Sequence, residues 1–316
     1  MDDEKSGVNL AYAKELLDSG QIIGIPTETV YGLAANGFDP DAIIRIFDAK
    51  KRPYFDPLIL HIGQADQLQL VAKKVPQDAL KLAQRFWPGP LTIILEKSDR
   101  IPDLVSSGLP TVGIRIPRHP ITLDLLGMLD YPLAAPSANP FGYISPTSAG
   151  HVLRQLGDLI PYVIDGGMCS VGVESTIVDL SGDQPVMRRL GAVTNQSISE
   201  ALGKPVLEDF RGGSNPAAPG LLAGHYAPRK PLYFGDIEAL LDKFGTQKVA
   251  VLGYTQTYGY PGIALSPGGS INEAARNLFA AMRKLDESNY EIILAETMPH
   301  KGIGRAMNDR LQRASR

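Results

Sequence analysis

The sequence predicts an α/β protein with a larger, mixed-sheet domain followed by a smaller α/β domain. Three observations lead to this expectation. Short apolar strands alternate with amphipathic helices from the first residues to about residue 202. Residues 203–230 are then rich in glycine and proline. Residues 231–316 return to alternating strands and helices.

The first domain, residues 1–202, is expected to contain eight strands and seven helices. The strands are predicted at 21–25, 57–62, 91–96, 111–116, 132–137, 162–165, 175–180 and 185–190. The helices are predicted at 9–19, 40–51, 64–74, 77–86, 120–129, 146–156 and 195–202. Several strands are nearly continuous apolar runs, which is typical of strands covered on both faces. The last two strands read as an antiparallel hairpin, so the sheet should be mixed.

The segment 203–230 is expected to be a linker because it cannot sustain a helix or a central strand. Beyond it, residues 231–316 show a βαββαβα order, which is typical of a small Rossmann-like C-terminal domain. This part lacks a GxGxxG motif, so nothing indicates a dinucleotide site.

Composition excludes several classes of protein. The net charge of -3 argues against a generally basic nucleic-acid binder, although it allows a local basic patch. A single cysteine, Cys169, cannot form an internal disulfide framework. The five histidines show no metal-ligand spacing, so no protein-held metal is expected. The acidic, polar N-terminus is unlike a secretory signal, and no apolar run approaches the roughly 20 residues of a membrane span. We therefore expect a soluble, cytoplasmic protein.

The stretch PTETVYG, residues 26–32, directly follows an apolar strand. An extended backbone would put Thr27 and Thr29 on one face and Glu28 on the other. Hydroxyls at the carboxyl end of a strand lie where α/β sheets usually bind ligands. A polar turn whose threonines bond nearby backbone groups is the alternative.

The next group of polar residues follows a predicted helix, in AKKRPYFDPLILH. Lys50 and Lys51 end that helix, where cations complement its dipole. Pro53 forces Arg52 out of the helix, so Arg52 should project from the loop toward solvent and ligand, where it would suit a polyphosphate. His61 lies one strand over from the threonines. It is either a buried core histidine or part of the same edge of the sheet as the threonine pair.

Arg115 lies inside the apolar strand of TVGIRIP, where an unpaired guanidinium would be costly. Two explanations are open. It pairs with a buried carboxylate such as Glu28, or it holds an anionic ligand, for which its planar fork is well suited.

In APSANPFGYISPTSAG, Ser145 and Pro146 read as the N-cap and first residue of a helix, whose exposed amides can bind phosphate. Ser137 and Asn139 follow a buried strand directly, which capping alone does not explain. Further on, Ser175 begins a strand and Arg189 ends another. There is no GxxxxGK[ST] motif and no nucleophile elbow, so positioning and charge stabilisation are favoured over covalent catalysis.

Six motifs in order, PTETVYGLA, KKRPYFDPLILH, WPGPLT, VGIRIP, APSAN and ESTIVD, resemble the YrdC-like threonylcarbamoyl-AMP synthase family. GHYAP and GIGRAMNDRLQRAS resemble its long, two-domain form. The resemblance implies a twisted YrdC-like α/β domain with a positively charged concave face. It also implies synthesis of threonylcarbamoyl-AMP and pyrophosphate from L-threonine, bicarbonate or CO₂, and ATP with Mg²⁺. A separate transferase would pass the threonylcarbamoyl group to tRNA next to the anticodon, and a weak direct tRNA contact is allowed.

The resemblance also implies roles for individual residues. Residues that would contact L-threonine are Thr29, His61, Arg115, Ala135 and Ser175. Residues that would contact ATP are Arg52, Asp56, Thr111, Ser137, Asn139, Ser145, Arg189 and Tyr226. Lys50 and Arg52 would be catalytic, stabilising charge on the phosphates. Asp56 departs from the asparagine of many relatives, and its carboxylate would repel phosphates unless it faces Mg²⁺ or the ribose. The linker would be either a lid over the labile carbamate or a passive tether.

The sequence leaves two alternative functions open. One is a protein that binds double-stranded RNA or tRNA through the same concave face without catalysis, which predicts salt-sensitive tRNA binding and no ATP consumption. The other is a relative with the same fold and a different carbamoyl-type substrate, which predicts ATP turnover that threonine does not stimulate.

Overall fold

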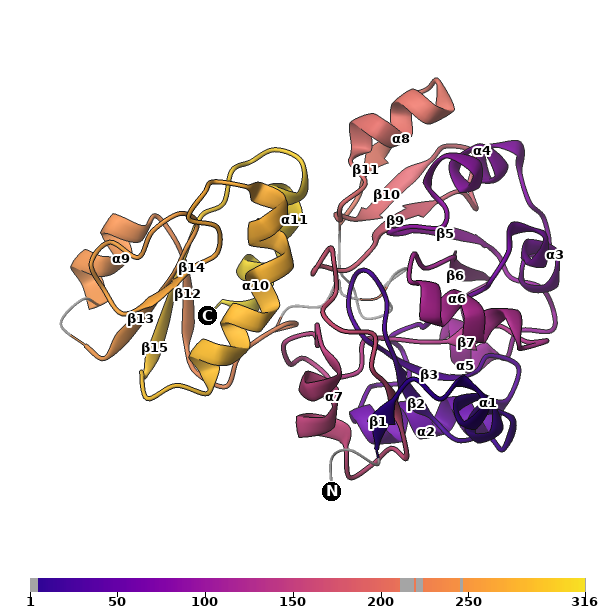
Figure 1. Ribbon diagram of the computed structural model, residues 1–316. Coiled ribbons are helices and arrows are strands. Elements are labelled where there is room, and N and C mark those ends of the chain that lie inside the picture. The colour runs from indigo at the N-terminus through magenta and orange to yellow at the C-terminus, as the bar shows by residue number, and fades with distance from the viewer. Residues whose placement is uncertain (1–4, 211–218, 220–223, 245–246, 316) are drawn as a thin grey trace.

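The computed structural model describes residues 5–210, 219, 224–244 and 247–315. Two sheets of different size, each flanked by helices, lie beside one another (Figure 1). Part of the predicted linker, residues 211–218 and 220–223, falls outside the described residues, so the choice between lid and tether stays a prediction.

The larger sheet has eleven strands within the described residues, in the order β1-β8-β2-β3-β7-β4-β6-β5-β9-β10-β11. Parallel pairs such as β4–β6 occur beside antiparallel pairs such as β9–β10, so the predicted mixed sheet and late hairpin are confirmed. The strands are β1 (Ser6–Gly7), β2 (Ile23–Ile25), β3 (Gly32–Asn36), β4 (Ile59–His61), β5 (Leu91–Glu96), β6 (Thr111–Arg115), β7 (Leu133–Ala134), β8 (Val163–Ile164), β9 (Thr176–Asp179), β10 (Val186–Arg189) and β11 (Leu207–Glu208).

Helices cover this sheet, and most lie where the apolar periodicity predicts them. They are α1 (Leu10–Asp18), α2 (Pro40–Lys50), η1 (Ala65–Gln67), α3 (Leu68–Val71), α4 (Gln77–Phe86), α5 (Asp103–Ser106), α6 (Pro120–Gly127), α7 (Ala149–Leu156) and α8 (Asn195–Leu202). Asp39 caps α2 by accepting from the amides of Asp41 and Ala42, and Lys51 ends it in the left-handed conformation.

The predicted start of the helix at 146–156 is wrong. The helix α7 begins at Ala149, and Ser148 is its N-cap, accepting from the amide of His151. Both Ser145 and Ser148 stand before a helical pattern, and Pro146 made Ser145 look like the cap. The first helical amide, that of Ala149, therefore lies four residues beyond Ser145.

The smaller sheet is parallel, in the order β12-β15-β13-β14, and its elements follow the predicted βαββαβα sequence. They are β12 (Leu232–Gly235), α9 (Ile237–Phe244), β13 (Val249–Gly253), β14 (Gly262–Ala264), α10 (Ile271–Asp286), β15 (Ile292–Glu296) and α11 (Ile303–Ala314). The helices α10 and α11 lie on the side of this sheet that faces the larger one, and α9 lies on the far side (Figure 1).

The two parts of the chain share an apolar core. One buried cluster contains Val30, Ile144 and Val173 of the first part together with Leu278 and Phe279 of α10. Burial of apolar side chains across this boundary stabilises the docking of the second part on the first. No helix in the described part of the chain has the length and apolar character needed to cross a bilayer.

Candidate active site

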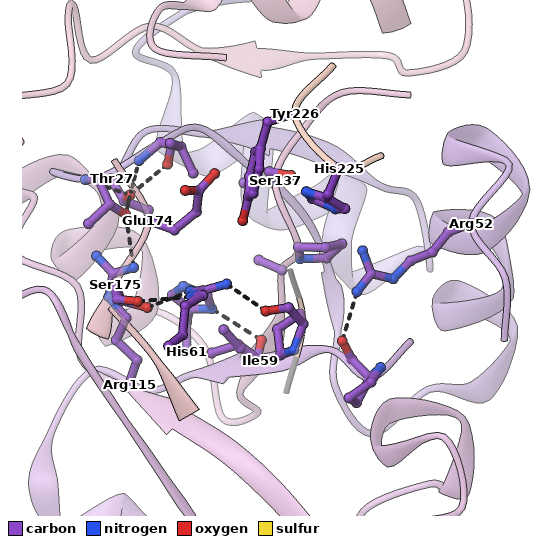
Figure 2. Close-up of a pocket in the computed structure, with 18 residues that line it drawn as sticks. Thr27, Arg52, Ile59, His61, Arg115, Ser137, Glu174, Ser175, His225 and Tyr226 are labelled. Carbon is purple, nitrogen blue, oxygen red and sulfur yellow. Dashed lines mark hydrogen bonds between the residues drawn. The ribbon is translucent and has the colours of Figure 1, made fainter. Parts of the chain in front are cut away.

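A cavity opens at the junction of the larger sheet, the end of α2 and the GHYAP segment (Figure 2). Its walls come from segments that are far apart in sequence: the loop between β2 and β3, the loop after α2, the strands β4, β6 and β10, and residues 135–137 and 174–175. Of the predicted site residues, those that line it are Thr29, Arg52, His61, Arg115, Ala135, Ser137, Ser175, Arg189 and Tyr226.

The stretch PTETVYG forms the connection between β2 and β3, and it lines the cavity with its threonines. Thr27 Oγ1 lies 2.9 Å from Thr29 Oγ1 and donates to the Val30 carbonyl at 2.6 Å. Thr27 thus turns the chain, as the polar-turn alternative expects, while both hydroxyls stay at the cavity wall. The Glu28 side chain is directed elsewhere, accepting from the Arg118 amide at 2.9 Å.

Arg115 lies on β6 beside His61 on β4, because these two residues are paired in register. The predicted partner of Arg115 is confirmed: its NH2 lies 2.7 Å from Glu28 Oε1, and its NH1 donates to Thr29 Oγ1 at 2.9 Å. Its Nε is buried and has no hydrogen-bond partner among the described residues. Arg115 is therefore both ion-paired and able to donate to an anion in the cavity.

His61 is buried beside this guanidinium, and its Nδ1 lies 3.3 Å from the Ile59 carbonyl. Burial, and then the charge of Arg115, lower the pKa of His61 to about 3. The ring is therefore neutral at physiological pH, and it can serve only as a neutral hydrogen-bonding group at the cavity wall.

Arg52 does not face solvent as the sequence suggests, because it is 6% exposed and paired with Asp56 at 2.9 Å. Its Nε and NH2 also donate to the carbonyls of Asp56 and Pro57 at 3.0 and 2.9 Å. The proline after Arg52 ends the helix. The loop then folds back, so that the carboxylate of Asp56, four residues on, pairs with the Arg52 guanidinium. Asp56 thus has a structural partner, and burial raises its pKa.

Lys50 is 1% exposed and is not among the residues that line the cavity. Its Nζ donates to the carbonyls of Ser137 and Asn139, both at 2.5 Å. Burial, and then Arg52, hold the pKa of Lys50 well below its ordinary value. In this structure Lys50 fastens the 137–139 loop to the end of α2, and its expected role in stabilising charge on the phosphates stays a prediction. The Asn139 side chain likewise bonds the local carbonyls of Pro140 and Tyr143 and does not line the cavity.

Ser175 and Arg189 form one hydrogen-bonded unit in the cavity wall. Arg189 donates from Nε to the Ser175 carbonyl and from NH2 to Ser175 Oγ, both at 3.0 Å, and from NH1 to the Pro219 carbonyl at 3.0 Å. Ser175 Oγ also lies 2.8 Å from Thr92 Oγ1. Burial lowers the pKa of Arg189 to about 10, which leaves it charged at neutral pH.

Ser145 does not line the cavity. Its Oγ donates to Oε1 of Glu174, which is a lining residue, at 2.5 Å. Thr111 lies in a smaller adjoining cavity, which shares Pro57, Ile59 and Pro219 with the first. The floor of that second cavity is apolar, with Ile94 and Ile177 on neighbouring strands. Thr111 and the main cavity therefore border one continuous region of the sheet.

Tyr226 enters the cavity from the GHYAP segment with its hydroxyl directed inward (Figure 2). The hydroxyl is buried and has no hydrogen-bond partner among the described residues. Its backbone φ is 68°, a left-handed value that non-glycine residues rarely adopt, and its ring stacks on Phe279 with 5.7 Å between centroids. Burial raises the pKa of Tyr226 to about 12, so it is a neutral donor for a ligand.

Three wall residues with polar side chains had no assigned role in the sequence: Thr27, Glu174 and His225. Thr27 and His225 stand next to predicted residues, so the motifs PTETVYG and GHYAP contained the signal. Glu174 likewise stands beside the predicted Ser175 in ESTIVD, but nothing local indicated its cation, Arg310, which is 136 residues away. Its carboxylate accepts from Ser145 and Arg310.

The described residues do not fit a resident magnesium site. No group of three or more His, Cys, Asp and Glu residues among them is placed to hold a metal ion. Asp56 is paired with Arg52, and Glu174 is engaged by Ser145 and Arg310.

Comparison with known proteins agrees with this arrangement. The Sua5/YciO/YrdC family model, described as "Telomere recombination", matches residues 15–191. The model described as "Threonylcarbamoyl-AMP synthase, C-terminal domain" matches residues 193–316. The chain belongs to the Sua5/YciO/YrdC family.

Relatives in this family match over nearly the whole chain. A threonylcarbamoyl-AMP synthase of Pyrococcus abyssi is 41% identical, covering 96% of this chain and 93% of that protein. One of Bacillus subtilis is 38% identical, covering 97% and 92%. The crystal structure of P. abyssi Sua5 complexed with L-threonine superposes with a TM-score of 0.91 at 40% identity, covering 97% of this chain and 94% of that one. The family and the YrdC-like fold expected from the motifs are thus confirmed.

Proposed function

We propose that this protein makes threonylcarbamoyl-AMP and pyrophosphate from L-threonine, carbon dioxide or bicarbonate, and ATP, as a nucleotidyltransferase. The observation that carries the proposal is one cavity lined by Arg52, Arg115 and Arg189 beside the hydroxyls of Thr27 and Thr29. Support comes from the two relatives named for this activity and from the related structure that holds L-threonine.

L-Threonine would bind against the wall formed by Thr29, His61, Arg115, Ala135 and Ser175. Arg115 would receive the carboxylate, since its buried Nε has no partner among the described residues and Glu28 fixes its far side. A neutral His61 and the hydroxyl of Thr29 would bond the small polar side chain or the amine. Ala135 packs against Gly32, because a Cβ added at Gly32 would lie 3.2 Å from the Ala135 Cβ. The cavity is therefore narrow beside Ala135.

ATP would lie along the remaining wall. Arg52 and Arg189 would meet the phosphates, together with Ser137 and the hydroxyl of Tyr226, which has no partner in the described part of the chain. The adenine would lie over the apolar floor of the adjoining cavity, with Thr111 at its edge. Ser145 and Asn139 would act behind the wall, through Glu174 and the 137–139 loop, and Asp56 would act by holding Arg52.

The chemistry needs charge stabilisation more than a covalent intermediate. The neutral threonine nitrogen bonds to the carbon of CO₂ and releases a further proton to solvent, giving a carbamate. A carbamate oxygen then bonds to the α-phosphorus of ATP while the bond to the pyrophosphate oxygen breaks. Negative charge grows on the leaving group, and Arg52 and Arg189, which line the cavity, would stabilise it.

The lining residues offer no free base among those that the structure describes. Glu174 is engaged by Ser145 and Arg310, and the pKa of His61 is about 3. Burial, followed by Arg52, holds the pKa of His225 well below its ordinary value. The threonine amine would therefore enter the reaction in its neutral form, having lost its proton to solvent.

We further propose that the product passes to a tRNA-threonylcarbamoyl transferase in the cytoplasm, because a mixed anhydride of this kind needs a prompt acceptor. A catalysis-free RNA-binding role is less well supported. The cavity's cations are buried and paired, as with Arg52 and Arg115, whereas backbone-tracking RNA sites use accessible cations.

The test is pyrophosphate release from ATP with purified protein and Mg²⁺. We expect release only when both L-threonine and bicarbonate are present, and weaker release with L-serine. Release that threonine does not stimulate would favour the relative with another carbamoyl-type substrate. Salt-sensitive tRNA binding with no ATP consumption would favour the RNA-binding protein.

A further inference from the structure

The two largest fully buried side chains among the described residues are Arg283 and Arg310, both on helices that flank the smaller sheet. Arg283 lies on α10 and is 1% exposed, and Arg310 lies on α11 and is 0% exposed. Arginine is rarely buried to this degree unless it is paired. Both side chains extend toward the larger sheet, so their partners show what the second part of the chain does for the first.

Arg310 contacts two residues of the cavity wall. Its Nε donates to Glu174 Oε2 at 2.9 Å, and its guanidinium carbon lies 5.2 Å from the centroid of the Tyr226 ring. Its NH2 donates to the Leu190 carbonyl at 2.8 Å, and its NH1 lies 2.5 Å from Asp309 Oδ2. The planar guanidinium of Arg310 therefore fixes the positions of the Glu174 carboxylate and the Tyr226 ring, which both line the cavity.

Glu174 is held from its other side as well. Its Oε1 accepts from Ser145 Oγ at 2.5 Å, and the Ser145 carbonyl accepts from Arg283 Nε at 3.3 Å. Arg283 also donates to the Ile144 carbonyl, and to Gln155 Oε1 at 3.0 Å. The arginines of α10 and α11 thus fasten both ends of one chain of contacts, Arg283–Ser145–Glu174–Arg310.

The charge of Glu174 makes this arrangement important for a nucleotide. An unpaired carboxylate in the wall would repel phosphates and would be costly to bury. Arg310 supplies the compensating charge from behind the wall, where it does not occupy ligand space. The next residue, Ser175, is bonded to Arg189, so a shift of Glu174 would move part of the wall proposed to bind threonine.

We propose that Arg310 is a positioning residue, through which the second part of the chain completes the active site by fixing Glu174 and Tyr226. This inference rests on the proposed function, because the wall it positions is the one that would hold threonine and ATP. Arg310 itself contacts no substrate. Its loss should therefore weaken threonine binding and slow turnover in a folded protein.

The experiment compares two arginines on the same helix. Arg310→Met removes the contact with the cavity wall. Arg305→Met is the matched control, since Arg305 donates to both Glu208 oxygens at 3.0 and 2.8 Å, across the same boundary but outside the cavity. Circular dichroism and melting temperature establish folding. Pyrophosphate release gives kcat and KM for each substrate, and calorimetry gives the affinity for L-threonine alone.

For Arg310→Met we expect the KM for threonine to rise at least tenfold and kcat to fall at least tenfold. Arg305→Met should stay within twofold of the wild type on both. Arg310→Lys keeps the positive charge but lacks the planar guanidinium. Its KM for threonine and its kcat should therefore lie between those of Arg310→Met and the wild type. In the double variant Arg310→Met/Glu174→Gln the losses should not multiply, because both changes break one contact.

A folded Arg310→Met protein with threonine KM and kcat within twofold of the wild type would overturn the positioning role. Multiplying effects in the double variant would also overturn it. If Arg310→Met does not fold, the same cycle is measured with Arg310→Lys. A wild-type protein without threonine-dependent turnover would instead overturn the proposed function, and the positioning role would fall with it.

Discussion

The Glu28 carboxylate and the Arg115 guanidinium form a buried ion pair, with 2.7 Å between Oε1 and NH2. The pair joins the loop between β2 and β3 to the end of β6, and both residues are at most 4% exposed. Removing one member of such a pair leaves an uncompensated buried charge. This pair therefore supports the fold and also aims Arg115 at the cavity.

The first prediction concerns Glu28→Gln. Breaking the pair should lower the free energy of unfolding by about 3–5 kcal/mol, and threonine affinity should fall at least tenfold because Arg115 loses its fixed orientation. Urea unfolding and calorimetric titration measure the two effects. Glu15→Gln, at an exposed position of α1, is the control and should change stability by less than about 0.5 kcal/mol. An unchanged threonine affinity in a destabilised Glu28→Gln protein would confine the pair to a structural role.

The second prediction concerns the neighbouring lysines at the end of α2. Lys50→Met would leave the Asn139 carbonyl without its Nζ donor and would remove the same donor from the Ser137 carbonyl, so turnover should fall by about 100-fold or more. Lys51→Met, one residue on and exposed, should keep turnover within twofold. Pyrophosphate release measures both. Equal losses in the two variants would contradict a specific role for Lys50.

The third prediction concerns Arg52 and Asp56. Arg52→Ala should abolish pyrophosphate release, and because Asp56 is then buried without a cation, it should also destabilise the fold by about 3–5 kcal/mol. Adding Asp56→Asn should recover much of the lost stability without recovering turnover. Chemical denaturation and pyrophosphate release separate these effects. Full turnover in the double variant would remove Arg52 from the proposed catalytic residues.

The fourth prediction is a pH dependence of stability. The pKa of His61 is about 3 in the folded chain and about 6.5 when unfolded. The unfolded state therefore binds more protons between these values, so this group's contribution is complete above pH 6.5 and is lost as pH falls. From pH 7 to pH 5 the wild type should lose about 2 kcal/mol more than His61→Gln. Equal losses in urea unfolding would show that His61 is readily protonated in the fold.

Much of the fold could be predicted because local signals agree with the final structure. The strand 91–96 and the helices 77–86 and 195–202 have the predicted bounds, since their apolar periods and ends are well marked. The strand β3, GLAAN, was missed because small residues and glycine carry little strand preference. It forms a strand because its neighbours β2 and β7 pair with it on both sides.

The candidate site was predicted in part for the same reason. Hydroxyls and arginines at strand ends gave Thr29, Arg115 and Ser175 local signals, and the cavity brings them together. The sequence could not indicate that Lys50 turns inward to backbone carbonyls. It also could not indicate that Arg310 meets Glu174, because such long-range contacts depend on how the two sheets dock.

The most direct test of the central claim is mass spectrometry of the nucleotide product formed with ¹³C-labelled bicarbonate. If the cavity joins threonine, CO₂ and the adenylate of ATP, the product should be threonylcarbamoyl-AMP that is heavier by about one mass unit than the unlabelled form. Formation of only AMP or ADP, with no label in any threonine-containing nucleotide, would contradict the account.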